Sequence, residues 1–140
     1  MLEAGSTSES SVGRSSVAAS AAPMRILVVE DHADTLRAMS RLLEMSGHCV
    51  RTATCVAEAL HAATQEAFDL IISDLGLPDG SGHDVMRELA GRSGVRGICL
   101  SGYDGQDDLN AARAAGFQDH LTKPIDFQKL QAAIERISAR

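Results

Sequence analysis

The sequence has no tryptophan, and aromatic residues make up only 3% of its 140 residues. It also lacks any apolar run close to the roughly 20 residues that a membrane-spanning helix needs. No basic start followed by an apolar block is present, so neither a membrane segment nor a secretory signal is predicted. Aliphatic side chains and alanine must therefore fill the core, and a hydrophobic share of 44% is enough for one domain.

Clusters of basic residues and paired cysteines are missing as well. The 13 Lys and Arg residues are scattered among 19 Asp and Glu residues, and the formal net charge is −6. Because nucleic-acid binding needs clustered positive charge, no direct nucleic-acid partner is expected. Cys49, Cys55 and Cys99 form neither a C-x-x-C pair nor a His/Cys metal spacing. We expect reduced thiols in or near the core of a cytoplasmic protein.

The N-terminal segment differs in composition from the rest of the chain. Residues 1–22 are mostly Ser, Ala and Gly, with almost no large apolar side chains. Such a segment cannot bury enough surface to offset the entropy of ordering, so a disordered tail or linker is predicted there. One folded domain is expected over residues 23–140. The linker-like composition suits a stand-alone protein and also a piece of a longer one.

Short apolar runs alternate with stretches of helical period from Met24 onward. Strands are predicted at residues 26–29, 48–53, 70–73, 97–100 and 117–121, and helices around residues 36–43, 56–67, 85–89, 106–115 and 127–137. Residues 75–82 form a turn-rich loop in this prediction, Gly47 and Asp126 cap helices, and the alanine-rich helix at 106–115 is loosely held. The alternation predicts an α/β fold with a parallel sheet.

Polar side chains follow four of the predicted strands. Glu30 and Asp31 come after the first strand, Asp74 after the third, Ser101 after the fourth and Lys123 after the fifth. The carboxyl ends of parallel strands share one edge of the sheet, where ligands bind in such folds. The sequence therefore predicts that these side chains meet in one pocket.

A pocket with several carboxylates needs a cation. Two carboxylates brought together repel each other by about 4 kcal/mol at an effective dielectric near 20. Oxygen ligands without His or Cys favour a hard ion, Mg²⁺ or Mn²⁺. With such an ion and Lys123 nearby, one carboxylate can attack phosphorus while the positive charges stabilise the transferring oxygens.

Four motifs lie on these elements in a specific order: VVEDH at 28–32, DLGLPDGSG at 74–82, LSG at 100–102 and LTKP at 121–124. With them, the chain resembles the receiver domain of two-component response regulators over all but its N-terminal tail. The resemblance implies a doubly wound, flavodoxin-like fold whose five-stranded parallel sheet has the order 2-1-3-4-5. It also implies a signalling switch and not an enzyme, apart from any kinase activity of a longer hybrid histidine kinase.

The resemblance assigns the acidic residues. Asp74 matches the phosphoacceptor. Asp31 matches a direct ligand of Mg²⁺, Glu30 the neighbouring acid that acts through water, and Gly76 would contribute its backbone carbonyl to the metal. The implied donor is a phosphohistidine on a sensor histidine kinase or a histidine phosphotransfer protein. The downstream partner is not identified, and its contact surface is expected around residues 104–137.

The resemblance assigns the remaining polar groups too. Ser101 and Lys123 would contact the phosphoryl group, and a cis Lys123–Pro124 bond is predicted. His120 occupies the place of an aromatic switch residue that turns inward with Ser101, and because histidine titrates near neutral pH we expect pH-sensitive output. Tyr103 is expected to shield the acyl phosphate from water.

Other interpretations of the same residues are weaker. Glu30 and Asp31 could cap the first helix, which is compatible with metal binding. An aspartate-nucleophile phosphohydrolase would need a second acid at position 76, where the chain has glycine. A flavin or nucleotide module would need a phosphate-binding loop after the first strand, and acids stand there instead. A degenerate receiver that only binds partners would not need the complete acid, hydroxyl and lysine set. The other histidines are expected in solvent or at the core edge, not as ligands: His32, His48, His61 and His83.

Overall fold

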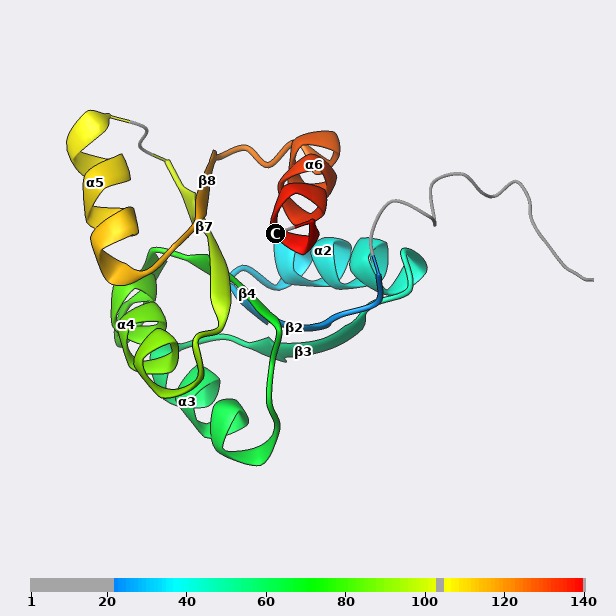
Figure 1. Ribbon diagram of the computed structural model, residues 1–140, viewed down its shortest axis with the longest axis horizontal. Helices are drawn as coiled ribbons and strands as arrows, with labels where there is room; N and C mark the ends of the chain where they lie inside the picture. Colours follow the sequence, from blue (N-terminus) through cyan, green and yellow to red (C-terminus); the bar gives the residue numbers. More distant parts are fainter. Residues whose placement is uncertain (1–21, 103–104, 140) are drawn as a thin grey trace, which may run out of the picture.

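Five parallel strands form the central sheet of the computed structural model, which describes residues 22–102 and 105–139. The strands are β2 (Arg25–Val29), β3 (Cys49–Ala53), β4 (Leu70–Asp74), β7 (Arg96–Ser101) and β8 (Asp119–Thr122). Their spatial order is β3-β2-β4-β7-β8 (Figure 1). Numbered along the chain, this is the order 2-1-3-4-5, as predicted.

Five helices cover the two faces of this sheet in the described part of the chain. They are α2 (Ala33–Met45), α3 (Val56–Gln65), α4 (Gly82–Ser93), α5 (Gln106–Ala115) and α6 (Phe127–Ser138). Helices α2 and α6 lie on one side of the sheet, and α3, α4 and α5 lie on the other (Figure 1). None of these helices is long and apolar enough to span a bilayer. The doubly wound arrangement confirms the predicted fold class.

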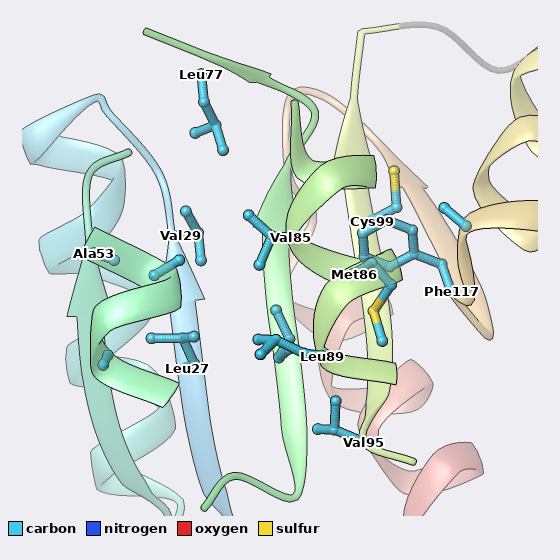
Figure 2. Close-up of a cluster of buried hydrophobic side chains, with 14 of the residues drawn as sticks. Leu27, Val29, Ala53, Leu77, Val85, Met86, Leu89, Val95, Cys99 and Phe117 are labelled. Atoms are coloured by element: carbon cyan, nitrogen blue, oxygen red, sulfur yellow. The ribbon is translucent and has the colours of Figure 1, made fainter. Parts of the chain in front are cut away.

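The central strands are apolar throughout because both faces of the sheet are buried. In β2, Ile26 and Val28 belong to the core under α2 and α6, whereas Leu27 and Val29 belong to the core under α3 and α4. All four side chains are fully buried. Figure 2 shows Leu27 and Val29 within the core under α3 and α4. Two helical layers thus hold β2 in the register that delivers Glu30 to the sheet edge.

The last strand starts later than predicted. The sequence predicts a strand from Phe117 to Leu121, but the β8 ladder runs from Asp119 to Thr122. Phe117 is 3% exposed and packs beside Met86 of α4, and both side chains occupy the space that a Cβ at Gly97 would need. Phe117 is therefore apolar because it fills the core at the end of α5, not because it belongs to the strand.

The predicted helix ends are mostly correct. Oδ1 of Asp126 accepts hydrogen bonds from the backbone N–H groups of Gln128 (2.8 Å) and Lys129 (3.3 Å), so Asp126 caps α6. Gly47 follows α2 with a φ of +98°, a left-handed conformation that favours glycine. Helix α5 buries only Ala112 and Ala115, but α3 buries only Ala59 and Ala62, so the loose packing expected of α5 stays a prediction.

The segment between β4 and α4 is more ordered than the loop that was predicted. Strands β5 (Gly76–Leu77) and β6 (Gly80–Ser81) pair as a short antiparallel hairpin. The hairpin returns the chain so that Gly82 opens α4 directly against β4. A Cβ at Gly82 would overlap the backbone carbonyl oxygen of Asp74 and lie 2.8 Å from Oγ of Ser73. Only glycine lets α4 begin this close to Asp74.

The cysteines differ from the expectation of core or near-core thiols. Cys99 is fully buried in β7, and burial, with the charge of Asp74, raises the pKa of its thiol to about 12. Cys55 is half-buried, but Cys49 is exposed at the start of the edge strand β3.

Candidate functional site

The carboxyl ends of three strands of the sheet, β2, β4 and β8, bring four charged side chains together. Glu30 and Asp31 follow β2, Asp74 ends β4 and Lys123 follows β8. Nζ of Lys123 lies 2.8 Å from Oδ2 of Asp74 and 3.2 Å from Oε1 of Glu30. One oxygen each of Glu30, Asp31 and Asp74 and one ring nitrogen of His32 lie within 4.8 Å of one another. The predicted convergence of Asp31, Asp74 and Lys123 is therefore present.

Burial differs sharply among these side chains. Glu30 is fully buried and Asp74 is 6% exposed, whereas 34% of the Asp31 side chain is open to solvent. Three carboxylates face the single ammonium of Lys123, which leaves an excess of negative charge. The cluster is thus buried at Glu30 and Asp74 and open to solvent at Asp31.

The ionisation of the buried groups reflects this arrangement. Burial raises the pKa of Asp74, although the hydrogen bond from Lys123 opposes the rise. Burial also acts to raise the pKa of Glu30, but hydrogen bonds from His32 and Lys123 outweigh it, so the pKa is lowered. Burial disfavours the charged form of Lys123, yet the hydrogen bond and charge of Asp74 prevail and raise its pKa. The ammonium and the Glu30 carboxylate are therefore charged at neutral pH.

The donor set fits a hard divalent cation. Carboxylate oxygens dominate the cluster, and their excess negative charge favours a cation at the open side. Gly76 lies two residues after Asp74, and its backbone N–H donates a hydrogen bond to the Asp74 carboxylate. This contact fixes the start of the hairpin against the Asp74 carboxylate. The role of the Gly76 carbonyl as a metal ligand stays a prediction.

Ser101 lies beside the cluster. It ends β7, is 3% exposed, and its carbonyl oxygen accepts a hydrogen bond from the backbone N–H of Lys123 at 2.7 Å. Because Asp74 pairs with Leu100 in the sheet register, Ser101 is one position further along the same edge. The Lys123–Pro124 bond that follows is cis, as predicted.

The two predicted accessory residues have different outcomes. His120 pairs with Cys99 in the sheet, and its buried Nε2 has no hydrogen-bond partner among the residues that the structure describes. Its side chain lines a cavity of about 110 Å³ with Leu109 and Ala112 of α5. Tyr103 lies outside the described residues, so its shielding role stays a prediction.

Sequence reasoning missed two further residues, one in the acidic cluster and one in the hairpin that follows β4. His32 was placed with the solvent or core-edge histidines, and its side chain is indeed 70% exposed, but Nδ1 lies 2.8 Å from Oε2 of Glu30. As the N-cap of α2 it makes no capping hydrogen bond with its side chain, and neither acid before it is the N-cap. Its position directly after two acids at a strand end was the available signal.

The second missed residue is Asp79 in the hairpin. Its carboxylate accepts hydrogen bonds from the backbone N–H groups of Val56 (2.7 Å) and Ala57 (3.0 Å) at the start of α3. Those two bonds, Ala57 first, lower the pKa of Asp79. Because the partners lie more than 20 positions away, no local pattern predicts this link between the hairpin and α3.

Comparisons with known proteins agree with the geometry. The family model described as the response regulator receiver domain matches residues 26–135. The transcriptional regulatory protein KdpE of Mycobacterium tuberculosis is 39% identical over 118 residues, which cover 81% of this chain and 52% of the relative. The chain thus spans about half the length of that regulator.

Solved structures show the same fold. The non-phosphorylated HemR receiver domain from Leptospira biflexa has a TM-score of 0.77 at 27% identity, covering 85% of this chain and 96% of that one. The beryllofluoride-activated DrrB receiver domain has a TM-score of 0.76 at 28% identity, covering 85% of this chain and 100% of that one.

Proposed function

Because the chain belongs to the response regulator receiver domain family, we propose that it takes a phosphoryl group onto Asp74 from a phosphohistidine donor. Receiver domains are phosphoacceptor modules of two-component signal transduction and not enzymes that turn over a separate substrate, and the family implies a histidine kinase as partner. The finer assignment is to Asp74 as acceptor, with a sensor kinase or a histidine phosphotransfer protein as donor.

The position of Asp74 carries this proposal. Its carboxylate is nearly buried, yet it stands in a pocket that opens toward solvent beside Asp31. Lys123 binds its Oδ2 at 2.8 Å and can neutralise charge that builds up on transferring oxygens. The excess of carboxylate over ammonium is what a phosphoryl site with a divalent cation needs, since the cation offsets the repulsion between acid and phosphate.

The phosphoryl group is transferred in a single displacement step. A carboxylate oxygen of Asp74 forms a bond to phosphorus, and the phosphorus–nitrogen bond of the donor phosphohistidine breaks. The electron pair of that bond stays on the imidazole, which takes up a proton as it leaves. Asp74 becomes an acyl phosphate, and Lys123 keeps its proton and pairs with the phosphoryl oxygens.

Mg²⁺, or Mn²⁺ in its place, would be held by Asp31, Asp74, the Gly76 carbonyl and, through water, Glu30. When bound, such an ion neutralises the phosphoryl oxygens and aligns them with the acceptor. The hydrogen bonds from Nζ of Lys123 and from the backbone N–H of His32 keep the Glu30 carboxylate oriented toward this place.

Ser101 and His120 are assigned the role of switch. Ser101 would contact the phosphoryl group, and the His120 ring would follow it from its place beside the cavity under α5. Leu109 and Ala112 of α5 border the same cavity, so the position of α5 can respond to this change. The output surface proposed for a downstream partner therefore includes α5.

His120→Phe should abolish any pH sensitivity of output, and an unchanged pH profile would count against the histidine as its source.

A cytoplasmic location completes the proposal. The chain carries free cysteines, Cys49 among them in an exposed position, and such thiols are typical of reducing compartments. The tail or linker predicted over residues 1–22 lies outside the described residues except for Ala22, so it stays a prediction.

The decisive experiment follows phosphoryl-analogue binding. The protein with Mg²⁺ is titrated with beryllofluoride, and backbone NMR signals of Asp74, Ser101 and His120 are recorded. We expect these signals to shift in the wild type and in Asp34→Asn, which removes an acid whose side chain is 95% exposed. Asp74→Asn should abolish the shifts. A small phosphoramidate donor should then label only proteins that keep Asp74, and phosphate uptake by Asp74→Asn would contradict the assignment.

A further inference from the structure

We propose that the imidazole of His32 is an additional ligand of the acidic cluster and shifts its cation preference toward Co²⁺ and Ni²⁺ relative to Mg²⁺. The inference rests on the metal site of the proposed function and concerns which ions that site selects. It adds a nitrogen donor to a site whose other donors are oxygens.

The position of His32 permits this role. One ring nitrogen of His32 lies within 4.8 Å of one oxygen each of Glu30, Asp31 and Asp74. Its Nδ1 lies 2.8 Å from Oε2 of Glu30 and 3.5 Å from Oδ1 of Asp31. Ligands on opposite sides of an ion with bonds of about 2.0–2.2 Å are about 4.0–4.4 Å apart. Only small side-chain adjustments are therefore needed to bring these atoms into one coordination shell. The His32 side chain is 70% exposed, so its ring has room to adjust.

Glu30 does not depend on the ring for its position. The backbone N–H of His32 donates to Oε2 of Glu30 at 3.1 Å, and Lys123 donates to Oε1 at 3.2 Å. If Nδ1 leaves Glu30 for a metal ion, both oxygens of the buried carboxylate keep a donor. The ring can therefore act as a ligand without exposing an unpaired buried charge.

The chemistry of the ligands decides which cations the site prefers. Carboxylate and carbonyl oxygens suit Mg²⁺, whereas imidazole suits nickel, copper, iron and zinc and contributes little to Mg²⁺. Asp31 and His32 are consecutive, and Nδ1 lies 3.5 Å from Oδ1 of Asp31, so the turn between β2 and α2 offers one oxygen and one nitrogen side by side. A nitrogen donor at this place raises affinity selectively for the transition ions.

The test compares two cations on matched variants. Wild type, His32→Ala and His61→Ala are titrated with Mg²⁺ and with Co²⁺ in a calorimeter. The pH is about 8, where histidine is ordinarily neutral. His61 is an exposed histidine on α3 and serves as the control. We expect His32→Ala to weaken Co²⁺ binding about tenfold or more and Mg²⁺ binding less than about twofold. The visible absorption of bound Co²⁺ should change in the same variant, and His61→Ala should match wild type in every measurement.

Each other outcome counts against the inference. An equal loss for both ions would mean that His32 only positions Glu30, and an unchanged ratio of affinities would mean that the ring is not a ligand. His32→Phe, which keeps a ring without nitrogen, replaces the alanine variant if that one is unfolded. Normal Mg²⁺ and beryllofluoride binding with an unchanged ratio overturns only the role of His32. Failure of wild type to bind either Mg²⁺ or beryllofluoride overturns the proposed function as well.

Discussion

Nζ of Lys123 and Oδ2 of Asp74 form a hydrogen bond of 2.8 Å between residues 49 positions apart in the sequence. The same ammonium contacts the fully buried Glu30 at 3.2 Å. Among the described residues, Lys123 is thus the only lysine or arginine whose side chain lies within hydrogen-bond distance of the two buried carboxylates, and it links the ends of β2, β4 and β8.

Removing this ammonium should destabilise the cation-free protein. Lys123→Met leaves Asp74 and Glu30 without their charge partner, and an unpaired buried polar group costs about 1–3 kcal/mol. Urea unfolding should show a loss of this size, partly restored by Mg²⁺. Lys129→Met on the exposed face of α6 is the control. Equal stability of the two variants without Mg²⁺ would show that the ion pair contributes nothing.

Mg²⁺ should stabilise the folded state through Asp31. A ligand that binds only the native protein adds about 1.4 kcal/mol at ten times its dissociation constant. Thermal unfolding should therefore shift to higher temperature with Mg²⁺ in wild type and in Asp34→Asn. Asp31→Asn removes the most exposed carboxylate of the cluster, and the shift should shrink or vanish. A full shift in that variant would exclude Asp31 as a ligand.

His48 should make stability fall in mild acid. It is 5% exposed, its Nδ1 accepts the N–H of Met24 at 3.0 Å, and burial lowers its pKa. The unfolded state therefore binds a proton at about pH 6.5 while the folded state does not, so unfolding becomes easier as pH falls through that value.

His48→Asn keeps an acceptor for Met24 but cannot be protonated. Its unfolding free energy should depend less on pH than that of wild type between about pH 7 and 5. The exposed His61→Asn should retain the wild-type profile. Identical slopes for wild type and His48→Asn in urea titrations at several pH values would refute this source of acid sensitivity.

Two glycines of α4 should respond oppositely to alanine. At Gly82 a methyl group would overlap the backbone carbonyl oxygen of Asp74, and such overpacking costs about 1–3 kcal/mol. The shift should also impair beryllofluoride binding at Asp74. At Gly91 nothing lies within 4 Å of a new Cβ, so Gly91→Ala should stabilise the helix by about 0.5–1 kcal/mol. Denaturation midpoints measure both, and tolerance of Gly82→Ala would disprove the close approach.

The cysteines should differ in reactivity. Cys49 is exposed, whereas Cys99 is fully buried with a pKa of about 12, and only the accessible thiolate reacts with alkylating reagents. Mass spectrometry after iodoacetamide treatment at neutral pH should find Cys49 modified and Cys99 intact. In urea, Cys99 should react as well. Early modification of Cys99 in the native protein would mean that β7 opens readily.

The fold and the charged residues of the site were predictable because the signals are local. Continuous apolar runs such as Ile26–Val29 indicate strands buried on both faces, and a parallel sheet sends all their carboxyl ends to one edge. Glu30, Asp31, Asp74 and Lys123 follow such strands, so their convergence is a consequence of topology. The start of β8 was misplaced because Phe117 is apolar for packing against α4, and a local pattern does not distinguish a strand residue from a core residue in a loop.

The sequence by itself determined the alternation of strands and helices along the chain, the acids and lysine at the strand ends, and the glycine at position 82, whereas the order of the strands in the sheet was expected from the family resemblance. Only the tertiary structure decided that Lys123 bridges Asp74 and Glu30, that Nδ1 of His32 turns back onto Glu30, and that Asp79 caps α3 from the hairpin. The reason is physical. Strand and helix patterns are set by near neighbours, whereas burial and hydrogen-bond partners of a side chain depend on segments that meet only after the chain has folded.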